Sequence, residues 1–325
     1  MEYRRLGRTG LNVSTLSLGS GGPNRFGQWL YAPAKNIIRL VRHALELGIN
    51  FFDTASTYGR SESLLGEALQ GVPRDRYFVS TKVQPLYRHT IINAAEARRQ
   101  VERSLQRLGV EELDILHLHR VSPESYEETL DRLMPELENL RSAGKVRYIG
   151  ITESSGRDPH HRMLKRALQD DLFDTVMVAY NLANSCAEDE VFPLAVTNDV
   201  GVIGMVAARH LVTRNTGERI KLFSRALAGL VTSPPGPDKL IFRLKEALSV
   251  LRRPRVRQAT PVTRENCEES LVLPVAGYTF AASHPAIATV LAGTTDPAHL
   301  QQNLAAVLAP ALTTGEIERL QMLLD

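Results

Sequence analysis

The sequence predicts an α/β protein with a single (β/α)8 barrel of the TIM type. Two observations predict this fold. Short apolar runs alternate with amphipathic stretches along the 325 residues, which is the pattern of repeated βα units. A chain of this length with 43% hydrophobic residues can also bury one large core, and single α/β barrels commonly reach this size. We therefore expect one domain over residues 1–325.

The elements of the barrel follow in order. Residues 5–11 are rich in glycine and precede a strand, so they predict an N-terminal β-hairpin that caps the base of the barrel. The apolar runs predict eight parallel strands near residues 14–19, 48–52, 77–82, 113–119, 146–150, 174–178, 201–206 and 287–291. Apolar residues recur at helical spacing over residues 37–47, 62–69, 94–108, 127–140, 161–168 and 188–196.

A long loop after the seventh strand, about residues 208–268, interrupts this alternation. It contains a proline-rich run at 232–238, a helical pattern over 239–251 and a basic run at 252–257. Connections of this length in a compact domain are usually functional or disordered. We interpret the segment as a lid-like insertion. Its charges are solvated by default, and the functional alternative is that its arginines contact an anionic group.

Composition excludes several classes of protein. The net charge of +3, from 39 basic and 36 acidic residues, gives no broad field for nucleic acid. The two cysteines, Cys186 and Cys267, are too few for a disulfide scaffold and lack the spacing of metal ligands. Nowhere does the sequence carry a signal peptide or an apolar run of membrane-spanning length. We expect a cytoplasmic protein, a monomer or weak homo-oligomer, with no metal, nucleic acid or membrane partner.

Four residues at or just after strand ends form the candidate catalytic site: Asp53, Tyr58, Lys82 and His119. In a parallel barrel, side chains at the carboxyl ends of the strands converge on one mouth. A phenol has an ordinary pKa of about 10 and is a poor acid at neutral pH unless its surroundings change. An ammonium at Lys82 would lower the pKa of Tyr58, and Asp53 would keep that lysine charged despite burial.

This constellation predicts proton delivery to a carbonyl oxygen while a hydride arrives from a cofactor. His119 would direct an N–H group at the same oxygen. The site as read requires neither a nucleophile–base pair nor a metal. The bland alternatives are a helix N-cap for Asp53 and a surface position for Lys82, but the ordered Asp53–Tyr58 pair and a lysine ending an apolar run argue against coincidence.

The order of these motifs resembles the aldo-keto reductase family over nearly the whole chain. The matching segments are residues 5–14, 53–59, 61–69, 114–119, 144–150 and 292–303, together with Lys82. The resemblance implies that Tyr58 is the general acid/base, that Lys82 and Asp53 tune it, and that His119 orients the carbonyl. It also implies an NADP(H) or NAD(H) cofactor and a small carbonyl or alcohol substrate.

The resemblance further implies a set of cofactor-binding positions, several of which depart from the family pattern. A Lys-Ser pair and an arginine commonly hold the 2′-phosphate of NADPH, and here these positions are Gly293, Thr294 and His299, so the guanidinium fork is missing. Thr294 can still donate a hydroxyl to phosphate. The remaining implied positions are Gly19 and Ser20 after the first strand, Thr152 and Glu153 at the carboxamide, Met177 and Met205 near the nicotinamide, and Gln302 and Asn303 at the adenine.

These departures resemble members that act as sugar dehydrogenases of the galactose and threo-aldose type, which share the His117–x–His119 spacing, and they favour a sugar or polyol substrate. Trp29 and Arg120 are candidate substrate-pocket residues, with packing and rim capping as the alternatives. For His117, which faces the barrel interior by strand parity, we expect a packing role. Two other functions stay open: a nucleotide-sensing regulatory protein on the same barrel, and a phosphate-handling barrel, for which residues 293–295 supply only part of a phosphate cup.

Overall fold

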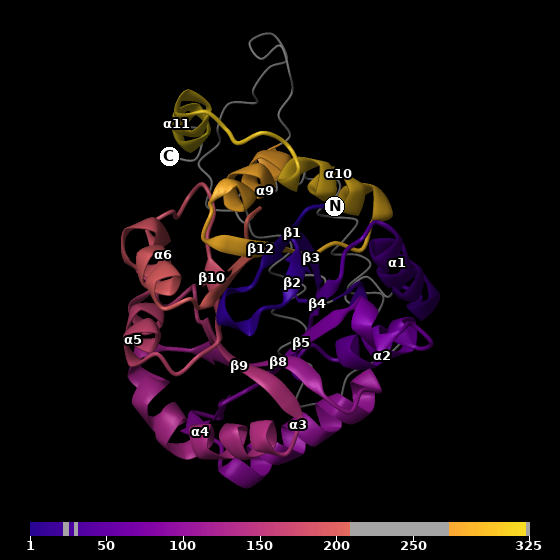
Figure 1. The fold of residues 1–325 in the computed structure, drawn as a ribbon, viewed down its shortest axis with the longest axis vertical. Coiled ribbons are helices and arrows are strands. Elements are labelled where there is room, and N and C mark those ends of the chain that lie inside the picture. The colour runs from indigo at the N-terminus through magenta and orange to yellow at the C-terminus, as the bar shows by residue number, and fades with distance from the viewer. Residues whose placement is uncertain (22–25, 29–31, 209–272, 323–325) are drawn as a thin grey trace.

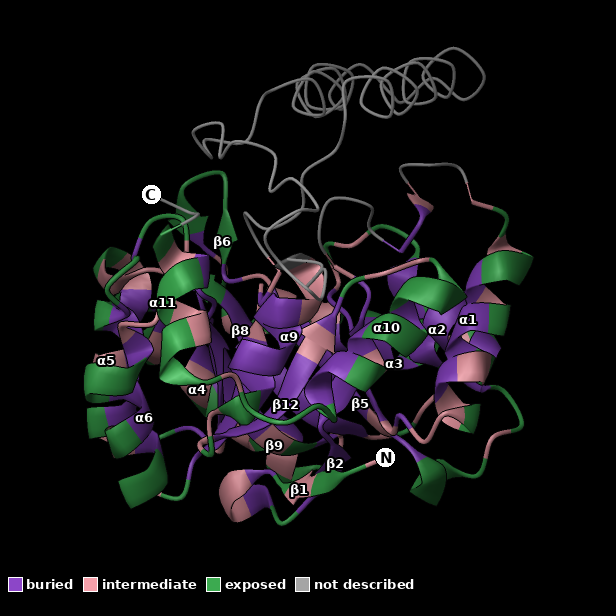
Figure 2. Ribbon diagram, turned by 90° about the horizontal axis from the view of Figure 1, so that it is seen from above, coloured by how far each residue is buried: buried purple, intermediate pink, exposed green. Residues whose placement is uncertain are grey.

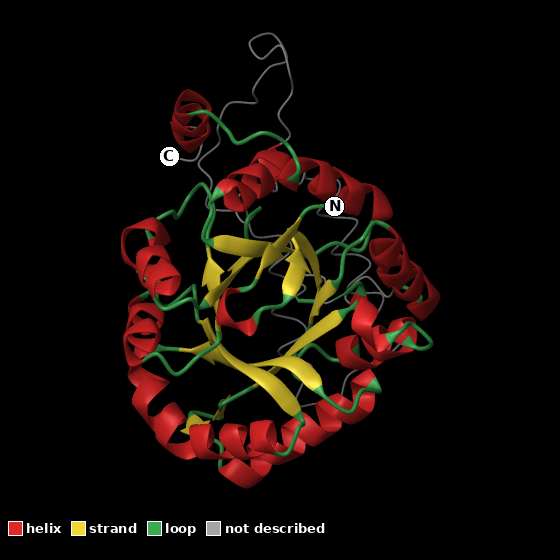
Figure 3. Cartoon of the chain, viewed as in Figure 1, coloured by secondary structure: helices red, strands yellow, loops and turns green. Residues whose placement is uncertain are grey.

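Eight parallel strands close into a barrel in the computed structural model of the chain, which describes residues 1–21, 26–28, 32–208 and 273–322. Figures 1 and 3 show the barrel ringed by helices. The α/β barrel predicted from sequence is confirmed, and each predicted strand overlaps an observed one. The strands are, in order around the barrel, β3 (Leu16–Gly19), β4 (Phe51–Asp53), β5 (Phe78–Val83), β8 (Leu113–Val121), β9 (Val146–Glu153), β10 (Thr175–Ala179), β11 (Gly201–Met205) and β12 (Ile287–Ala292).

The helices pack their apolar faces against the outside of the barrel (Figure 2). In α1, for example, Ile37, Leu40, Val41 and Ala44 recur at helical spacing and are buried. The six helices predicted from sequence are confirmed, and three further helices follow β11 and β12. The described helices are α1 (Ala34–Glu46), α2 (Ser61–Leu69), α3 (Ala94–Leu108), α4 (Tyr126–Ser142), α5 (Arg162–Asp170), α6 (Ala187–Thr197), α9 (Leu273–Ser283), α10 (Pro297–Val307) and α11 (Thr314–Met322).

The N-terminal hairpin closes the base of the barrel, as predicted. Strand β1 (Tyr3–Arg5) pairs antiparallel with β2 (Asn12–Ser14), and a short 3-10 turn, Gly7–Thr9, joins them. Leu6, fully buried, reaches the start of β11 so closely that a Cβ on Gly201 would lie 2.7 Å from its Cγ atom. The Tyr148 hydroxyl donates to the backbone oxygen of Thr9 at 2.6 Å. The hairpin is therefore a plug on which the interior core of the barrel rests.

A second hairpin, which the sequence did not predict, follows β5. Strands β6 (Leu86–Tyr87) and β7 (Thr90–Ile91) pair across a tight turn in which Arg88 and His89 have φ angles of 45° and 69°. Two-residue hairpin turns of this hand normally use Asn-Gly or a similar pair, so Arg-His gives no turn signal. Arg132 of α4 donates from Nη1 to the Ile91 carbonyl at 3.2 Å and ties the hairpin to the barrel wall.

Several predictions concern residues outside the described ranges. The lid-like insertion predicted at 208–268 falls there except for its first residue, and so does Trp29. The single domain over residues 1–325 stays a prediction. Among the helices that the structure describes, none is long and apolar enough to cross a lipid bilayer.

Candidate active site

The centre of the site is a buried ion pair at the mouth of the barrel. Asp53 is the last residue of β4, and Lys82 lies near the end of the neighbouring strand β5. Lys82 Nζ lies 2.5 Å from each carboxylate oxygen of Asp53 and donates to the Thr54 carbonyl at 2.7 Å. The two side chains are almost fully buried. Because every hydrogen of the ammonium has an acceptor, the charge of Lys82 is held in a fixed place inside the barrel.

Tyr58 and His119 complete the group. The Tyr58 hydroxyl lies 3.4 Å from His119 Nε2, and the two rings meet edge to face with centroids 5.6 Å apart. Lys82 Nζ lies 5.5 Å from the centre of the Tyr58 ring. Tyr58 is half-buried, so its ring spans from the buried ammonium toward the mouth. The structure thus brings all four predicted residues together.

Two residues that the sequence analysis did not single out hold Tyr58 in place. Gln28 donates from Nε2 to the Tyr58 carbonyl at 2.8 Å, and its Oε1 accepts from the backbone N–H of Arg60. Gly21 lies against the phenol: a Cβ there would sit 2.9 Å from Cε2 and 3.1 Å from the hydroxyl oxygen of Tyr58. The glycine run after the first strand was the available signal for this close approach.

Burial decides the protonation of the site. It is the main reason why the pKa of His119 lies well below its ordinary value, and the cations at Lys82 and Arg120 lower this pKa further. The ring of His119 is therefore neutral at physiological pH, and its buried Nδ1 atom has no hydrogen-bond partner among the described residues. Burial also raises the pKa of Asp53, while its contacts with Lys82 and Ser80 act in the opposite direction.

A second polar layer lies below the tetrad. Ser80 Oγ lies 3.1 Å from Asp53 Oδ1 and 3.1 Å from His117 Nδ1. On its other side, His117 Nε2 lies 3.1 Å from Thr175 Oγ1. These side chains are fully buried, and His117 occupies the interior position that strand parity predicts. The spacing of His117 from His119 singled out this residue in the sequence, but its hydrogen-bond partners were not predicted.

The predicted cofactor positions after β3 and β12 leave polar groups and space available. Gly19 ends β3 and Ser20 follows it, and the buried Ser20 Oγ atom has no hydrogen-bond partner in the described part of the chain. Among the described residues, the nearest atom to a Cβ on Gly293 would be the Gly21 carbonyl oxygen, at 3.8 Å, so this part of the structure leaves room beside the Gly293 backbone. Thr294 forms a local turn with Asp296 at the start of α10, His299 and Gln302 are exposed on that helix, and Asn303 is buried. This donor set fits a nucleotide cofactor.

The predicted carboxamide positions are engaged within the protein. Thr152 Oγ1 accepts from the backbone N–H of Arg120 at 2.8 Å. Glu153 Oε1 accepts from the Ala179 N–H at 2.6 Å, and Oε2 lies 2.7 Å from Nδ1 of the buried His161. Burial raises the pKa of Glu153, against the effect of His161. Contact of these two side chains with a cofactor stays a prediction.

Three further predicted positions border the barrel interior or its rim. Met177 is buried in the interior core near the N-terminal plug, while Met205 ends β11 and is partly exposed. Arg120 is exposed and has a left-handed backbone, with φ 56°, where the pairing of β8 with β9 shifts register. This irregularity follows His119 directly and sets the direction in which its ring leaves the strand.

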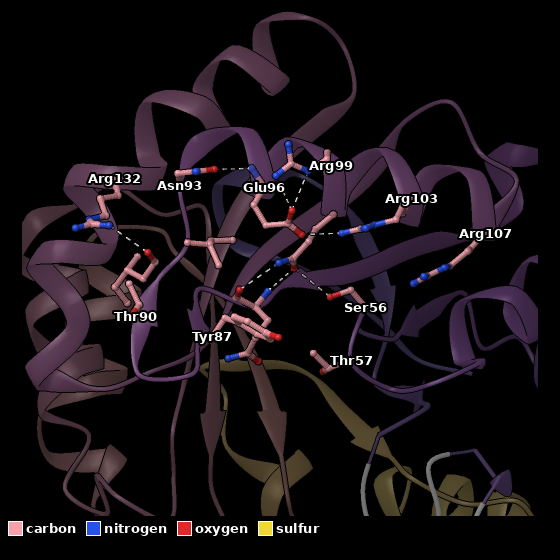
Figure 4. A pocket seen from close by; sticks show the side chains of 14 residues that line it. Ser56, Thr57, Tyr87, Thr90, Asn93, Glu96, Arg99, Arg103, Arg107 and Arg132 are labelled. Atoms are coloured by element: carbon pink, nitrogen blue, oxygen red, sulfur yellow. Dashed lines mark hydrogen bonds and ion pairs between the residues drawn. The ribbon is translucent and has the colours of Figure 1, made fainter. Parts of the chain in front are cut away.

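A cavity of about 810 Å³ lies outside the tetrad, on the rim of the mouth (Figure 4). Its wall includes Ser56 and Thr57, which directly precede Tyr58, and the hairpin formed by β6 and β7. Ser56 Oγ donates to the Lys82 carbonyl at 3.0 Å, so the wall is bonded to the strand that carries the lysine. None of the four tetrad residues lines this cavity.

Comparison with known proteins agrees with this geometry. A model of the aldo/keto reductase family matches residues 17–325. An L-galactose dehydrogenase of Arabidopsis thaliana is 37% identical over 158 residues, a stretch that spans only about half of either chain, 47% of this one and 48% of the relative. An NADH-specific methylglyoxal reductase of Escherichia coli (strain K12) is 26% identical over 94% of both chains. An aldo-keto reductase structure from Bacillus halodurans covers 100% of this chain and 97% of its own, with a TM-score of 0.69 at 24% identity, and supports the fold.

The neutral, buried His119 predicts how stability depends on pH. Its pKa is lowered in the folded protein, whereas in the unfolded chain it returns to about 6.5. Below that pH the imidazole of His119 binds a proton in the unfolded chain but stays neutral in the folded protein. The free energy of unfolding therefore falls as the pH falls. The slope is at most about 1.4 kcal/mol per pH unit for one group.

Urea unfolding between pH 5 and pH 8 measures this slope. We expect His119→Gln to flatten it, whereas the same change at the exposed His89, His89→Gln, leaves it as in the unaltered protein. Equal slopes for the unaltered protein and His119→Gln would contradict a neutral His119, since carboxylates with raised pKa values contribute equally to both.

Proposed function

The chain belongs to the aldo/keto reductase family, whose members are NAD(P)H-dependent oxidoreductases, and from that premise we propose that it interconverts a small carbonyl compound and the corresponding alcohol with Tyr58 as general acid/base. One observation carries the proposal: the ammonium of Lys82, fixed by Asp53, lies against the ring of a half-buried tyrosine whose hydroxyl is next to a neutral histidine.

In the reductive direction, Tyr58 gives its proton to the carbonyl oxygen. The positive charge of Lys82 favours the phenolate that remains, because in a buried site the attraction between the two charges is poorly screened. Asp53 holds the amino group of Lys82 in place beside the ring. Oxidation of an alcohol reverses the step, with the phenolate accepting the hydroxyl proton.

His119 orients the substrate. Its neutral ring can carry the proton on Nε2, the nitrogen that faces the Tyr58 hydroxyl, and so donate a hydrogen bond to the same carbonyl oxygen. A charged imidazolium there would compete with Tyr58 as the proton source, and burial prevents it. We propose that the exposed Arg120, next in the chain, contacts a polar substrate group at the rim.

A bound reduced nicotinamide cofactor supplies the hydride. We propose that six residues border its nicotinamide side: Gly19, Ser20, Thr152, Glu153, Met177 and Met205. The groups after β12 that would hold its adenosine half are Gly293, Thr294, His299, Gln302 and Asn303. Ser20 supports this placement, since its buried hydroxyl lacks a protein partner among the described residues.

The absence of a guanidinium at positions 293, 294 and 299 favours NADH over NADPH as the preferred cofactor. The Escherichia coli relative is named NADH-specific, which agrees with this reading. For the substrate we propose an aldehyde, ketone or sugar of small size. The names of the two relatives, which refer to L-galactose and to methylglyoxal, define the first compounds to test.

Replacement of the proposed acid gives the direct test. Tyr58→Phe removes the transferable proton while it keeps the ring against Lys82, so we expect kcat to fall by roughly 10²- to 10⁴-fold. Steady-state rates with NADH and methylglyoxal, and with NAD⁺ and L-galactose, measure this, and quenching of protein fluorescence by NADH reports whether the cofactor still binds.

The exposed Tyr3, on the N-terminal hairpin at the base of the barrel, provides the matched control, and Tyr3→Phe should leave the rates unchanged. Retained turnover in Tyr58→Phe would remove Tyr58 from the chemistry. Cofactor binding without turnover on any carbonyl in the unaltered protein would instead favour the nucleotide-sensing alternative.

Cofactor preference is tested at position 299. His299→Arg places a guanidinium on the exposed face of α10, and one charge-assisted hydrogen bond to the 2′-phosphate should raise kcat/KM with NADPH by roughly tenfold relative to NADH. His299→Gln, which adds no charge, serves as the control. An unaltered protein that already prefers NADPH, or a ratio that does not move in His299→Arg, would refute the proposed basis of the preference.

A further inference from the structure

The buried chain of hydrogen bonds beneath the tetrad gives His117 a role beyond packing. We propose that His117 is a positioning residue for the proton transfer: held by Thr175, it donates through Nδ1 to Ser80, which in turn directs its hydroxyl proton at Asp53 and fixes the carboxylate against Lys82. The inference rests on the proposed function of Tyr58. It concerns groups that do not touch the substrate.

Asp53 sets the direction of donation along this series of hydrogen bonds. Both of its carboxylate oxygens accept from Lys82 at 2.5 Å, and in this contact with an ammonium the carboxylate acts as an acceptor only. Ser80 has a single hydroxyl proton, and its Oγ atom lies 3.1 Å from Asp53 Oδ1. Ser80 therefore donates that proton to Asp53. Were the proton directed elsewhere, two lone pairs would face each other beside a buried negative charge.

The tautomer of His117 follows from the same count of protons. With its own proton committed to Asp53, Ser80 Oγ can only accept from His117, so Nδ1 of the imidazole carries a hydrogen. Burial and the charge of Lys82 place the pKa of His117 well below its ordinary value, so the ring is neutral and Nε2 is bare. Thr175 Oγ1, 3.1 Å away, therefore donates to Nε2. All three bonds point toward Asp53.

The absence of a side chain at Gly150 leaves room in the barrel for this imidazole. His117 in β8 is aligned with Lys82 on one side and with Gly150 in β9 on the other. A Cβ on Gly150 would lie 2.4 Å from His117 Cδ2, 2.7 Å from Nε2 and 2.3 Å from Thr175 Oγ1. Only glycine at this position lets the ring cross β9 to reach Thr175. A simple apolar core would not require this gap.

Histidine nitrogen chemical shifts test the tautomer directly. In long-range ¹H–¹⁵N spectra of the full chain labelled at histidine, we expect His117 to show a protonated Nδ1 and a bare Nε2 throughout pH 5.5 to 8. His117→Gln assigns the signal. An Nε2-protonated ring, or titration near the ordinary histidine pKa, would overturn the proposal whether or not Tyr58 is the acid.

Two substitutions separate positioning from packing. Asn at position 117 keeps an N–H group near the place of Nδ1, whereas Leu keeps bulk and loses the donor. We expect His117→Leu and Ser80→Ala each to lower kcat by about tenfold with KM for NADH unchanged, His117→Asn to retain most of the rate, and the double variant Ser80→Ala/His117→Leu to lose little more than either single one.

The opposite order, with Leu active and Asn impaired, would assign His117 to packing and refute the proposal. Thermal unfolding of each variant shows whether it folds, and the tautomer measurement stands independently if one does not. If Tyr58→Phe keeps its activity, the proposed function fails on its own, while the tautomer result remains a separate outcome.

A different observation supports a second site, in the cavity of Figure 4. Four arginines line it, Arg99, Arg103 and Arg107 from α3 and Arg132 from α4, against a single lining carboxylate, Glu96. Glu62 and Glu128 engage Arg107 and Arg132 from outside the lining. The other two guanidiniums share Glu96, at 2.8 Å each, so one positive charge at the cavity is uncompensated.

We infer that this cavity binds a phosphate-class oxyanion, as carried by phosphorylated small molecules. Glu96 already occupies the place of such an anion, because Arg99 and Arg103 converge on it and their contacts hold its pKa below the ordinary value. Guanidinium groups bind phosphate oxygens in the same bidentate manner as carboxylates. The adenosine positions on α10 belong to a different side of the barrel, so this site is distinct from them.

Titration calorimetry with inorganic phosphate and, in a second arm, pyrophosphate tests the site in 0.15 M chloride. We expect Glu96→Gln, which releases two guanidiniums, to bind pyrophosphate at least fivefold more tightly than the unaltered protein, and Arg103→Gln to bind at least fivefold more weakly. Stronger binding of pyrophosphate than phosphate would identify a polyphosphate ligand, and equal binding a single phosphate group.

Charge-matched controls lie outside the cavity. Glu67→Gln makes the same charge change on the exposed face of α2, and Arg98→Gln removes an α3 arginine that pairs with Glu136. Neither should change the affinity. Equal gains for Glu96→Gln and Glu67→Gln would show a general charge effect and refute the site, as would the absence of measurable binding to both the unaltered protein and Glu96→Gln.

Discussion

The ion pair between Lys82 and Asp53 is the interaction on which the site depends. A charged pair this deeply buried adds little net stability, since desolvation offsets much of the attraction, but removal of one partner leaves an isolated charge at a cost of about 3–5 kcal/mol. The contacts around it therefore serve both charges. Thr54 takes the remaining hydrogen of the ammonium, and Ser80 adds a donor to the carboxylate. The tyrosine, at the edge of this group, meets a fixed positive charge.

The sequence predicted those parts of the fold and site that depend on local pattern and residue type. The barrel strands were recognisable as apolar runs, and the tetrad could be proposed because a lysine and a histidine ending such runs must lie at the mouth. The hairpin after β5 was not predicted because Arg88 and His89 give no turn signal. The segment around 208–268 was recognised only as an interruption.

Hydrogen bonds between distant strands could not be predicted from the sequence, because they depend on register. Ser80 is an ordinary strand residue until β5 lies beside β4, where it faces Asp53. Likewise, Gly150 reads as a turn-forming residue at the end of a strand, whereas its function is to make room for the ring of His117. The expected packing role of His117 rested on parity alone. Parity gave the direction of the side chain correctly but could not identify its partners.

The N-terminal plug has a consequence for synthesis on the ribosome. Leu6 leaves the exit tunnel nearly two hundred residues before Gly201, the glycine against which it packs. Until then the hairpin formed by β1 and β2 has no docking surface, and a two-stranded ribbon is only marginally stable in water by itself. The residues of this hairpin therefore stay undocked, and accessible to chaperones and proteases, until most of the barrel has been translated.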